Sequence, residues 1–193
     1  MPSHAPTRFT FRKALARFRG NRRGSAAVEF ALVAPMFFGL LFAIIETALA
    51  FFSGQVLETI AQDSARAILT GQAQAQGGSV AACQTTPNSV TACDQTTFKN
   101  FVCSKIPALF ECSKLYVDVV STSSFGTLNL TNYGNSCSFN PTGMQYNAGG
   151  SGQVVVVRLF YQWPLVVTGL GLNIGCSNKR LLVATAAFKN EPF

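Results

Sequence analysis

The chain has few charged residues and almost no histidine. Charged residues make up 12% of its 193 residues, about half the share found in an ordinary soluble domain. Its one histidine, His4, lies in the N-terminal tail. The rest of the chain therefore has no imidazole for acid–base catalysis or for activating a cysteine. The sequence also lacks phosphate-binding loops and nucleophile motifs. We expect no enzymatic activity, no cofactor and no catalytic residue.

Acidic residues are missing from the first 24 positions, and the net charge of +7 is concentrated there. Binding to nucleic acid needs a basic face on a folded domain, and this sequence suggests none, so we expect no nucleic-acid partner. A basic stretch directly before an apolar run instead predicts a cytoplasmic N-terminus. Residues 1–24 are either an unstructured leader or a short amphipathic helix on anionic lipid. The cations concerned are Arg8, Arg12, Lys13, Arg17, Arg19, Arg22 and Arg23.

A long apolar segment follows the leader, over residues 25–52. No charged residue lies between Phe30 and Ile45, a stretch of about 24 Å as a helix. A bilayer core is about 30 Å thick, so a spanning helix must extend past Glu29, Glu46 or both. We predict a single transmembrane helix over residues 25–52, with these two glutamates near opposite interfaces.

The helix is predicted to continue as an amphipathic segment over residues 53–78, reaching about Gln76 and ending at Gly77-Gly78. The opposite face is polar. The apolar stripe at helical spacing comprises Val56, Leu57, Ile60, Ala61, Ser64, Ala65 and Ile68.

Residues 79–193 form the predicted exported domain. It begins with a polar loop, followed by a short helix ending near Pro107. Alternating or continuous apolar runs then predict strands over 115–121, 153–162 and 181–189, with a turn or flexible loop at 149–152. One helix followed by strands and long loops indicates an α+β fold, in which an antiparallel sheet is covered by the helix stripe.

All six cysteines follow the apolar segment, and none forms a CxxC pair, so we expect disulfides in an oxidising compartment and no metal site. The nearest-neighbour pairing is Cys83–Cys93, Cys103–Cys112 and Cys137–Cys176. In a continuous helix Cys103 and Cys112 would lie about 13.5 Å apart. Their pairing therefore requires a helix break, which Pro107 supplies. The alternative is that some of the cysteines are buried thiols.

The junction of leader and apolar segment carries the most informative motif. Gly24 follows two arginines, Ser25 comes next, and Glu29-Phe30 lies five and six positions after the glycine. This resembles the Gly-x-x-x-x-Glu-Phe/Tyr signal of pilins of the tight-adherence (Tad) branch of type IV pili. Further along, residues 60–66, IAQDSAR, resemble the segment that follows the membrane helix in TadE/TadG-like pseudopilins.

The resemblance implies a structural role and a set of partners. A prepilin peptidase would cut between Gly24 and Ser25 on the cytoplasmic side, and Glu29 would neutralise the terminal amine of a neighbouring subunit. A glutamate without a partner at the interface is the alternative for Glu29. The implied partners are the lipid bilayer, the prepilin peptidase, other Tad pilins or pseudopilins and inner-membrane assembly proteins. The implied location is the bacterial inner membrane, in a single pass, with the C-terminal domain in the periplasm or a surface pilus.

A secreted protein is the competing interpretation. Ala48-Leu49-Ala50 fits the small-residue cleavage site of a Sec signal peptide. However, the apolar stretch is longer than the usual hydrophobic region of about 7–15 residues, and Glu46 lies just before the cut. The first residue of the mature protein, Ser25 or Phe51, separates the two interpretations.

Overall fold

The computed structural model describes residues 25–74, 93–135, 137–165 and 178–192. The chain divides into two compact units, Met1–Phe42 and Ala43–Phe193. The leader, Gly24, Cys83 and Cys176 lie outside the described residues, so the predictions made for them stay predictions. Gly77-Gly78 also lie outside the described residues.

The long helix predicted from the sequence is present as α2, Ser25–Leu69, and it passes through Pro35 without interruption. It ends earlier than the predicted Gln76. Gly71 has a φ of 74°, which favours glycine. Its amide donates to the carbonyl of Ile68, and the amide of Ala73 donates to that of Ala67. These bonds satisfy carbonyls that the helix end would leave open, so Gly71 ends the helix where Gly77-Gly78 was expected to.

The second half of α2 has the two faces that the sequence predicts. Leu57, Ala61 and Ile68 are completely buried, whereas Gln62, Asp63 and others on the opposite side are exposed. The buried stripe belongs to the main hydrophobic core of the Ala43–Phe193 unit. Burial of this apolar stripe is the main stabilising term for the helix segment, because isolated helices gain little from propensity alone.

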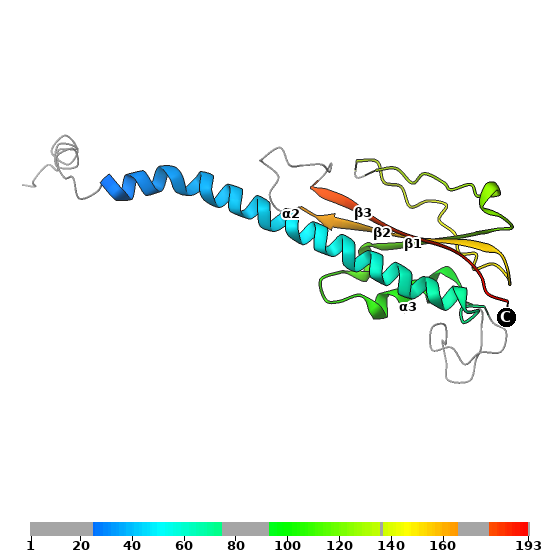
Figure 1. Ribbon diagram of the computed structural model, residues 1–193. Coiled ribbons are helices and arrows are strands. Elements are labelled where there is room, and N and C mark those ends of the chain that lie inside the picture. The colour runs from blue at the N-terminus through cyan, green and yellow to red at the C-terminus, as the bar shows by residue number, and fades with distance from the viewer. Residues whose placement is uncertain (1–24, 75–92, 136, 166–177, 193) are drawn as a thin grey trace, which may run out of the picture. The chain divides into compact units, whose positions relative to one another are not determined.

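Three antiparallel strands form one sheet in the order β1-β2-β3. Their bounds are Leu115–Thr122 for β1, Val154–Pro164 for β2 and Lys179–Lys189 for β3. Each matches a predicted strand to within two residues. Figure 1 shows them side by side behind α2. The predicted α+β architecture is therefore confirmed.

A second helix, α3, spans Gln95–Lys105 and packs beside β1. Asp94 begins it through a capping box with Thr97, in which each side chain bonds to the other residue's amide. Such a box satisfies two of the open donors at a helix start. The bond from Thr97 is the main reason why the pKa of Asp94 is lowered.

The two faces of the sheet are covered differently. Side chains such as Val117, Val157 and Leu182 point to the core that contains α2 and α3. On the other face, Tyr133 and Phe139 of the long connection between β1 and β2 pack on Phe160. The sequence marks residues 122–152 only as rich in Gly, Asn and Ser. The structure shows that their described part covers one side of the sheet, with the predicted turn at Gly149 and Gly152.

Candidate functional site

The start of α2 carries the predicted processing and assembly residues. Ser25 is the first residue that the structure describes, and it is already helical, whereas Gly24 lies outside the described residues. Glu29 is one turn further along and is exposed. Residues 25 and 29 are thus about 6 Å apart along the helix axis.

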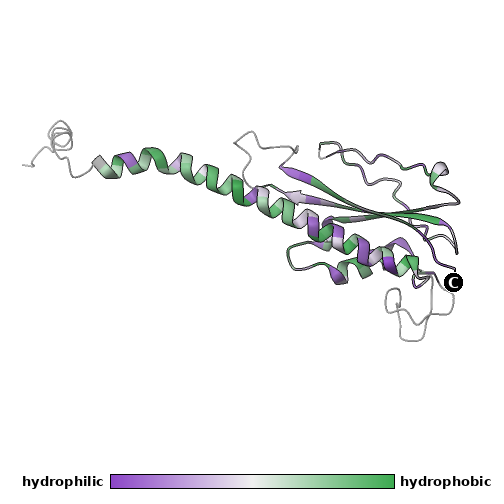
Figure 2. Cartoon of the chain, viewed as in Figure 1, coloured by the Kyte–Doolittle hydropathy of each residue, from purple (hydrophilic) through white to green (hydrophobic). Residues whose placement is uncertain are grey.

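The surface of the first half of α2 is apolar and exposed. Its large hydrophobic side chains are exposed from Val28 to Phe52, and between residues 53 and 69 there are none of this kind. Figure 2 shows the same change along the helix, from mostly green to mixed green and purple. The most apolar window of 18 residues is only 6% buried. A soluble core helix of this hydropathy would be covered by protein, so this exposed apolar surface is compatible with a membrane span.

Pro35 is exposed within this apolar segment and has no amide hydrogen to donate. It therefore leaves the carbonyl of Ala31, four residues earlier, without its usual helical donor. Such a proline is tolerated in membrane helices, where neighbouring groups satisfy the carbonyl.

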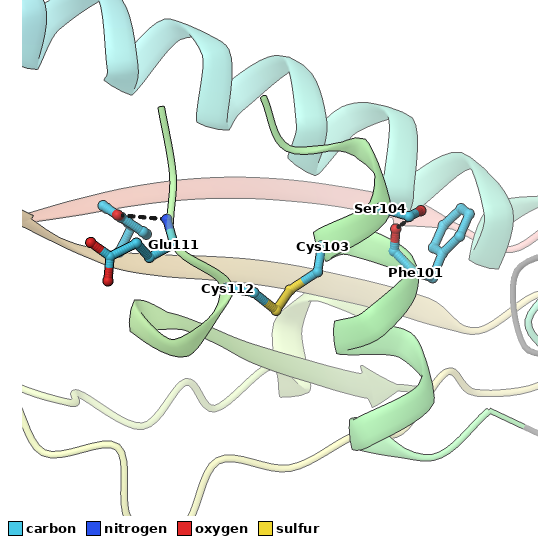
Figure 3. The surroundings of a disulfide bond; sticks show 6 residues. Phe101, Cys103, Ser104, Glu111 and Cys112 are labelled. Atoms are coloured by element: carbon cyan, nitrogen blue, oxygen red, sulfur yellow. Dashed lines mark hydrogen bonds between the residues drawn. A yellow bond between two sulfur atoms is a disulfide. The ribbon is translucent and has the colours of Figure 1, made fainter. Parts of the chain in front are cut away.

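The predicted disulfide between Cys103 and Cys112 is confirmed, with Cα atoms 5.6 Å apart. Helix α3 ends at Lys105, and Ile106 is extended with ψ 136°, as expected of a residue before proline. The chain then turns back through Pro107, and Figure 3 shows the bridge joining the end of α3 to the segment before β1. The hydroxyl of Tyr161 accepts from the amide of Glu111 at 3.0 Å, which holds this segment against β2.

Cys93 and Cys137 are also disulfide-bonded. Their predicted partners, Cys83 and Cys176, lie outside the described residues. The pairings Cys83–Cys93 and Cys137–Cys176 therefore stay predictions.

A buried ion pair between Asp118 and Arg158 could not be predicted from the sequence. These residues are directly opposite each other in β1 and β2, and Arg158 Nη2 lies 2.6 Å from Asp118 Oδ2. The only trace of the pair in the sequence is a single charged residue inside each of two apolar strands, acidic in one and basic in the other. The sequence does not fix the strand register that brings them together.

A pocket of about 370 Å³ lies between α3 and the start of β1, with Pro141 and Met144 on its third side. Lys99 stands over the ring of Tyr116 at its wall, 5.7 Å from the centroid. Within the described residues no group of three or more His, Cys, Asp or Glu side chains is placed to hold a metal ion.

Together these features define the structural class of the protein. It is an α+β protein, and among the residues that the structure describes, one long apolar helix is compatible with a single membrane span. The family described as TadE-like protein matches residues 24–66, which begin at the predicted processing glycine and end within the amphipathic half of α2. The resemblance to TadE-like proteins, a structural, pilus-associated family, is thereby confirmed over this segment. No curated protein and no solved structure matches the chain.

Proposed function

We propose that this protein is a pseudopilin-like assembly component of a Tad-type pilus, acting in pilus biogenesis and surface adhesion. It is made with a cytoplasmic leader, is cut by a prepilin peptidase between Gly24 and Ser25, and stays in the inner membrane or enters the pilus through α2. Its disulfide-bearing domain faces the periplasm. Its partners are other Tad pilins or pseudopilins and the inner-membrane assembly proteins.

One observation carries this proposal: the family match begins at Gly24, the residue at which the motif places the cut. The basic leader ends at the same place. Glycine before the cut leaves space for the backbone in a protease cleft, and the leader's positive charge holds the bond on the cytoplasmic side.

Glu29 has a defined role in the proposal. A lone carboxylate at the edge of the hydrocarbon costs free energy that pairing with a cation reduces. The α-amine freed at Ser25 of a neighbouring subunit is such a cation. The exposed position of Glu29 on α2 supports this role.

The family match also weighs against Sec processing after Ala50, because it extends without interruption from residue 24 to residue 66. In addition, Ala50 is only 2% exposed and belongs to the core of the Ala43–Phe193 unit. A cut after Ala50 would remove this residue and the preceding helical turn from the packed domain.

Pilus counts in a strain that lacks the native gene test the proposal. Complementation with wild type should restore surface pili. Glu29→Gln should lower the count several-fold while the amount of membrane-bound, processed protein stays unchanged. Glu46→Gln is the matched control, because Glu46 lies in the same helix and has no assembly role in the proposal, and it should behave like wild type. Normal piliation with Glu29→Gln, or equal losses for both variants, would contradict the assembly role.

A further inference from the structure

The first residues of β3 place two cations at one end of the sheet. Lys179 and Arg180 lie opposite Pro164 and Trp163 of β2. Just beyond this pair, the amide of Leu165 donates to the carbonyl of Asn178 at 2.8 Å, which closes the end of the ladder. The two cations are thus held by strand pairing. Lys179 is exposed and Arg180 is partly exposed.

Arg180 faces the long helix. Its guanidinium carbon lies 5.5 Å from the centroid of the Phe51 ring, within the range of a cation–π contact. Phe51 is 62% exposed and Phe52 is 59% exposed, and they are the last large exposed hydrophobic residues of α2. Lys179 comes directly before Arg180 in β3 and therefore points to the opposite face of the sheet. The Phe51–Arg180 patch, formed by Phe51 and Arg180, lies where the apolar surface of α2 ends, with Lys179 as a second cation at the same end of the sheet.

The depth of this patch follows from helix geometry. A bilayer core of about 30 Å takes about 20 helical residues. Counted from Ala26 or from Glu29, that length ends between Ile45 and Ala48. Phe51 is then only about 4.5–9 Å beyond the hydrocarbon, in the layer of lipid headgroups. Long basic side chains near the end of a membrane helix typically reach into this layer.

The positive charge at this end of the sheet favours an anionic ligand. Within the described residues, neither Lys179 nor Arg180 has a salt bridge to an acidic side chain. Both cations are thus available to an anion. A guanidinium binds a phosphate oxygen pair through two parallel hydrogen bonds, and an ammonium adds a point charge.

We infer that the Phe51–Arg180 patch binds the phosphates of anionic phospholipids in the bilayer that α2 spans, and so holds this end of the sheet at the membrane surface. This inference rests on the membrane span of the proposed function. It adds a lipid-headgroup site on the folded domain, at the opposite end of the span from the basic leader.

Trp163 gives a direct readout because it is the only tryptophan of the chain and is paired with Arg180. The experiment reconstitutes the full chain into vesicles with a dansyl-labelled lipid headgroup and measures energy transfer from Trp163. Vesicles of phosphatidylcholine are compared with vesicles containing phosphatidylglycerol. We expect more transfer in the anionic vesicles, and we expect added salt to remove the increase because it screens the phosphates.

The double variant Lys179→Gln/Arg180→Gln should lose the increase in transfer. Lys189→Gln is the matched control, because Lys189 is an exposed cation at the other end of β3, and it should keep the increase. Equal transfer in the two lipids for wild type, or equal losses in the double variant and Lys189→Gln, would overturn the inference. Soluble inorganic phosphate should not reduce the transfer at matched ionic strength; a reduction would point to a free-phosphate site and overturn the lipid assignment.

Flotation of the vesicles separates this inference from the proposed function. Protein that floats with both lipids but shows no lipid-dependent transfer contradicts only the headgroup site. Protein that fails to float contradicts the membrane span itself.

Discussion

Arg158 reaches across from β2 to Asp118 of β1, and the pair is the only buried ion pair among the described residues. Asp118 is completely buried. Its carboxylate also accepts from the Tyr133 hydroxyl at 2.9 Å and from the Gln145 amide at 3.1 Å, while Arg158 donates to the carbonyl of Thr131. The pair therefore joins the connection between β1 and β2 to the sheet that it covers.

Asp118→Ala should lower the free energy of unfolding by about 3–5 kcal/mol, because it leaves the Arg158 charge buried without its partner. Urea denaturation of the full chain in detergent, followed by Trp163 fluorescence, measures this. Asp118→Leu/Arg158→Met should cost less than Asp118→Ala, since neither charge then remains. Glu111→Gln, which removes an exposed ion pair with Lys114, should change stability little. Equal effects for Asp118→Ala and Glu111→Gln would contradict the role of the buried pair.

Two tyrosines of the same connection should respond oppositely to loss of the hydroxyl. The Tyr133 hydroxyl bonds to Asp118 and to the carbonyl of Gly143, so Tyr133→Phe should cost about 1–3 kcal/mol. The Tyr146 hydroxyl is buried without a hydrogen-bond partner in the described part of the chain. Tyr146→Phe should therefore be neutral or stabilising. The same denaturation experiment compares the two variants, and a larger loss for Tyr146→Phe would contradict this reading of the two hydroxyls.

Stability should decrease in alkaline solution. Burial raises the pKa of Tyr133, and the hydrogen bond to Asp118 adds to the effect; burial also raises the pKa of Tyr146. When the pKa of a tyrosine is higher in the folded than in the unfolded state, stability is at its full value below about pH 10. It falls as pH rises from there through the raised pKa, because the unfolded state loses the proton first. Tyr146→Phe should make the alkaline decrease shallower. A decrease that is identical in this variant would contradict the assignment to Tyr146.

The Cys103–Cys112 bridge should contribute roughly 2–3 kcal/mol, because it closes a short loop in the unfolded chain. Replacing both cysteines with alanine should lower stability by that amount without changing the other bridges. Non-reducing peptide mapping of the wild type should recover Cys103 linked to Cys112, and should also show whether Cys93 pairs with Cys83 and Cys137 with Cys176. Free thiols at all six positions would contradict both the pairing and the oxidising compartment.

The sequence predicts the secondary structure well where one physical signal dominates. The apolar stripe from Val56 to Ile68 has one period over several turns, and each predicted strand is a continuous or alternating apolar run. The break at Pro107 is strong enough to predict the Cys103–Cys112 bridge. By contrast, α2 could end at Gly71 or at Gly77-Gly78. The sequence alone does not show that Gly71 takes the positive φ.

The contacts that could not be predicted depend on distant residues meeting. Asp118 and Arg158 are separated by 40 positions, and only the register of β1 and β2 places them opposite each other. The position of Arg180 over Phe51 likewise depends on how β3 lies beside α2. The Gly24–Glu29 motif is local, which is why the family resemblance is visible from the sequence before the sheet is known.

The first residue of the mature protein tests the central claim most directly. The full chain is purified from membranes of cells with an active prepilin peptidase, and its N-terminus is sequenced. The account predicts Ser25 for the wild type and an uncut leader for Gly24→Arg, because a large cation would block the protease cleft. A wild-type protein that begins at Phe51, or one that keeps its leader, would contradict the proposed processing and the assembly role built on it.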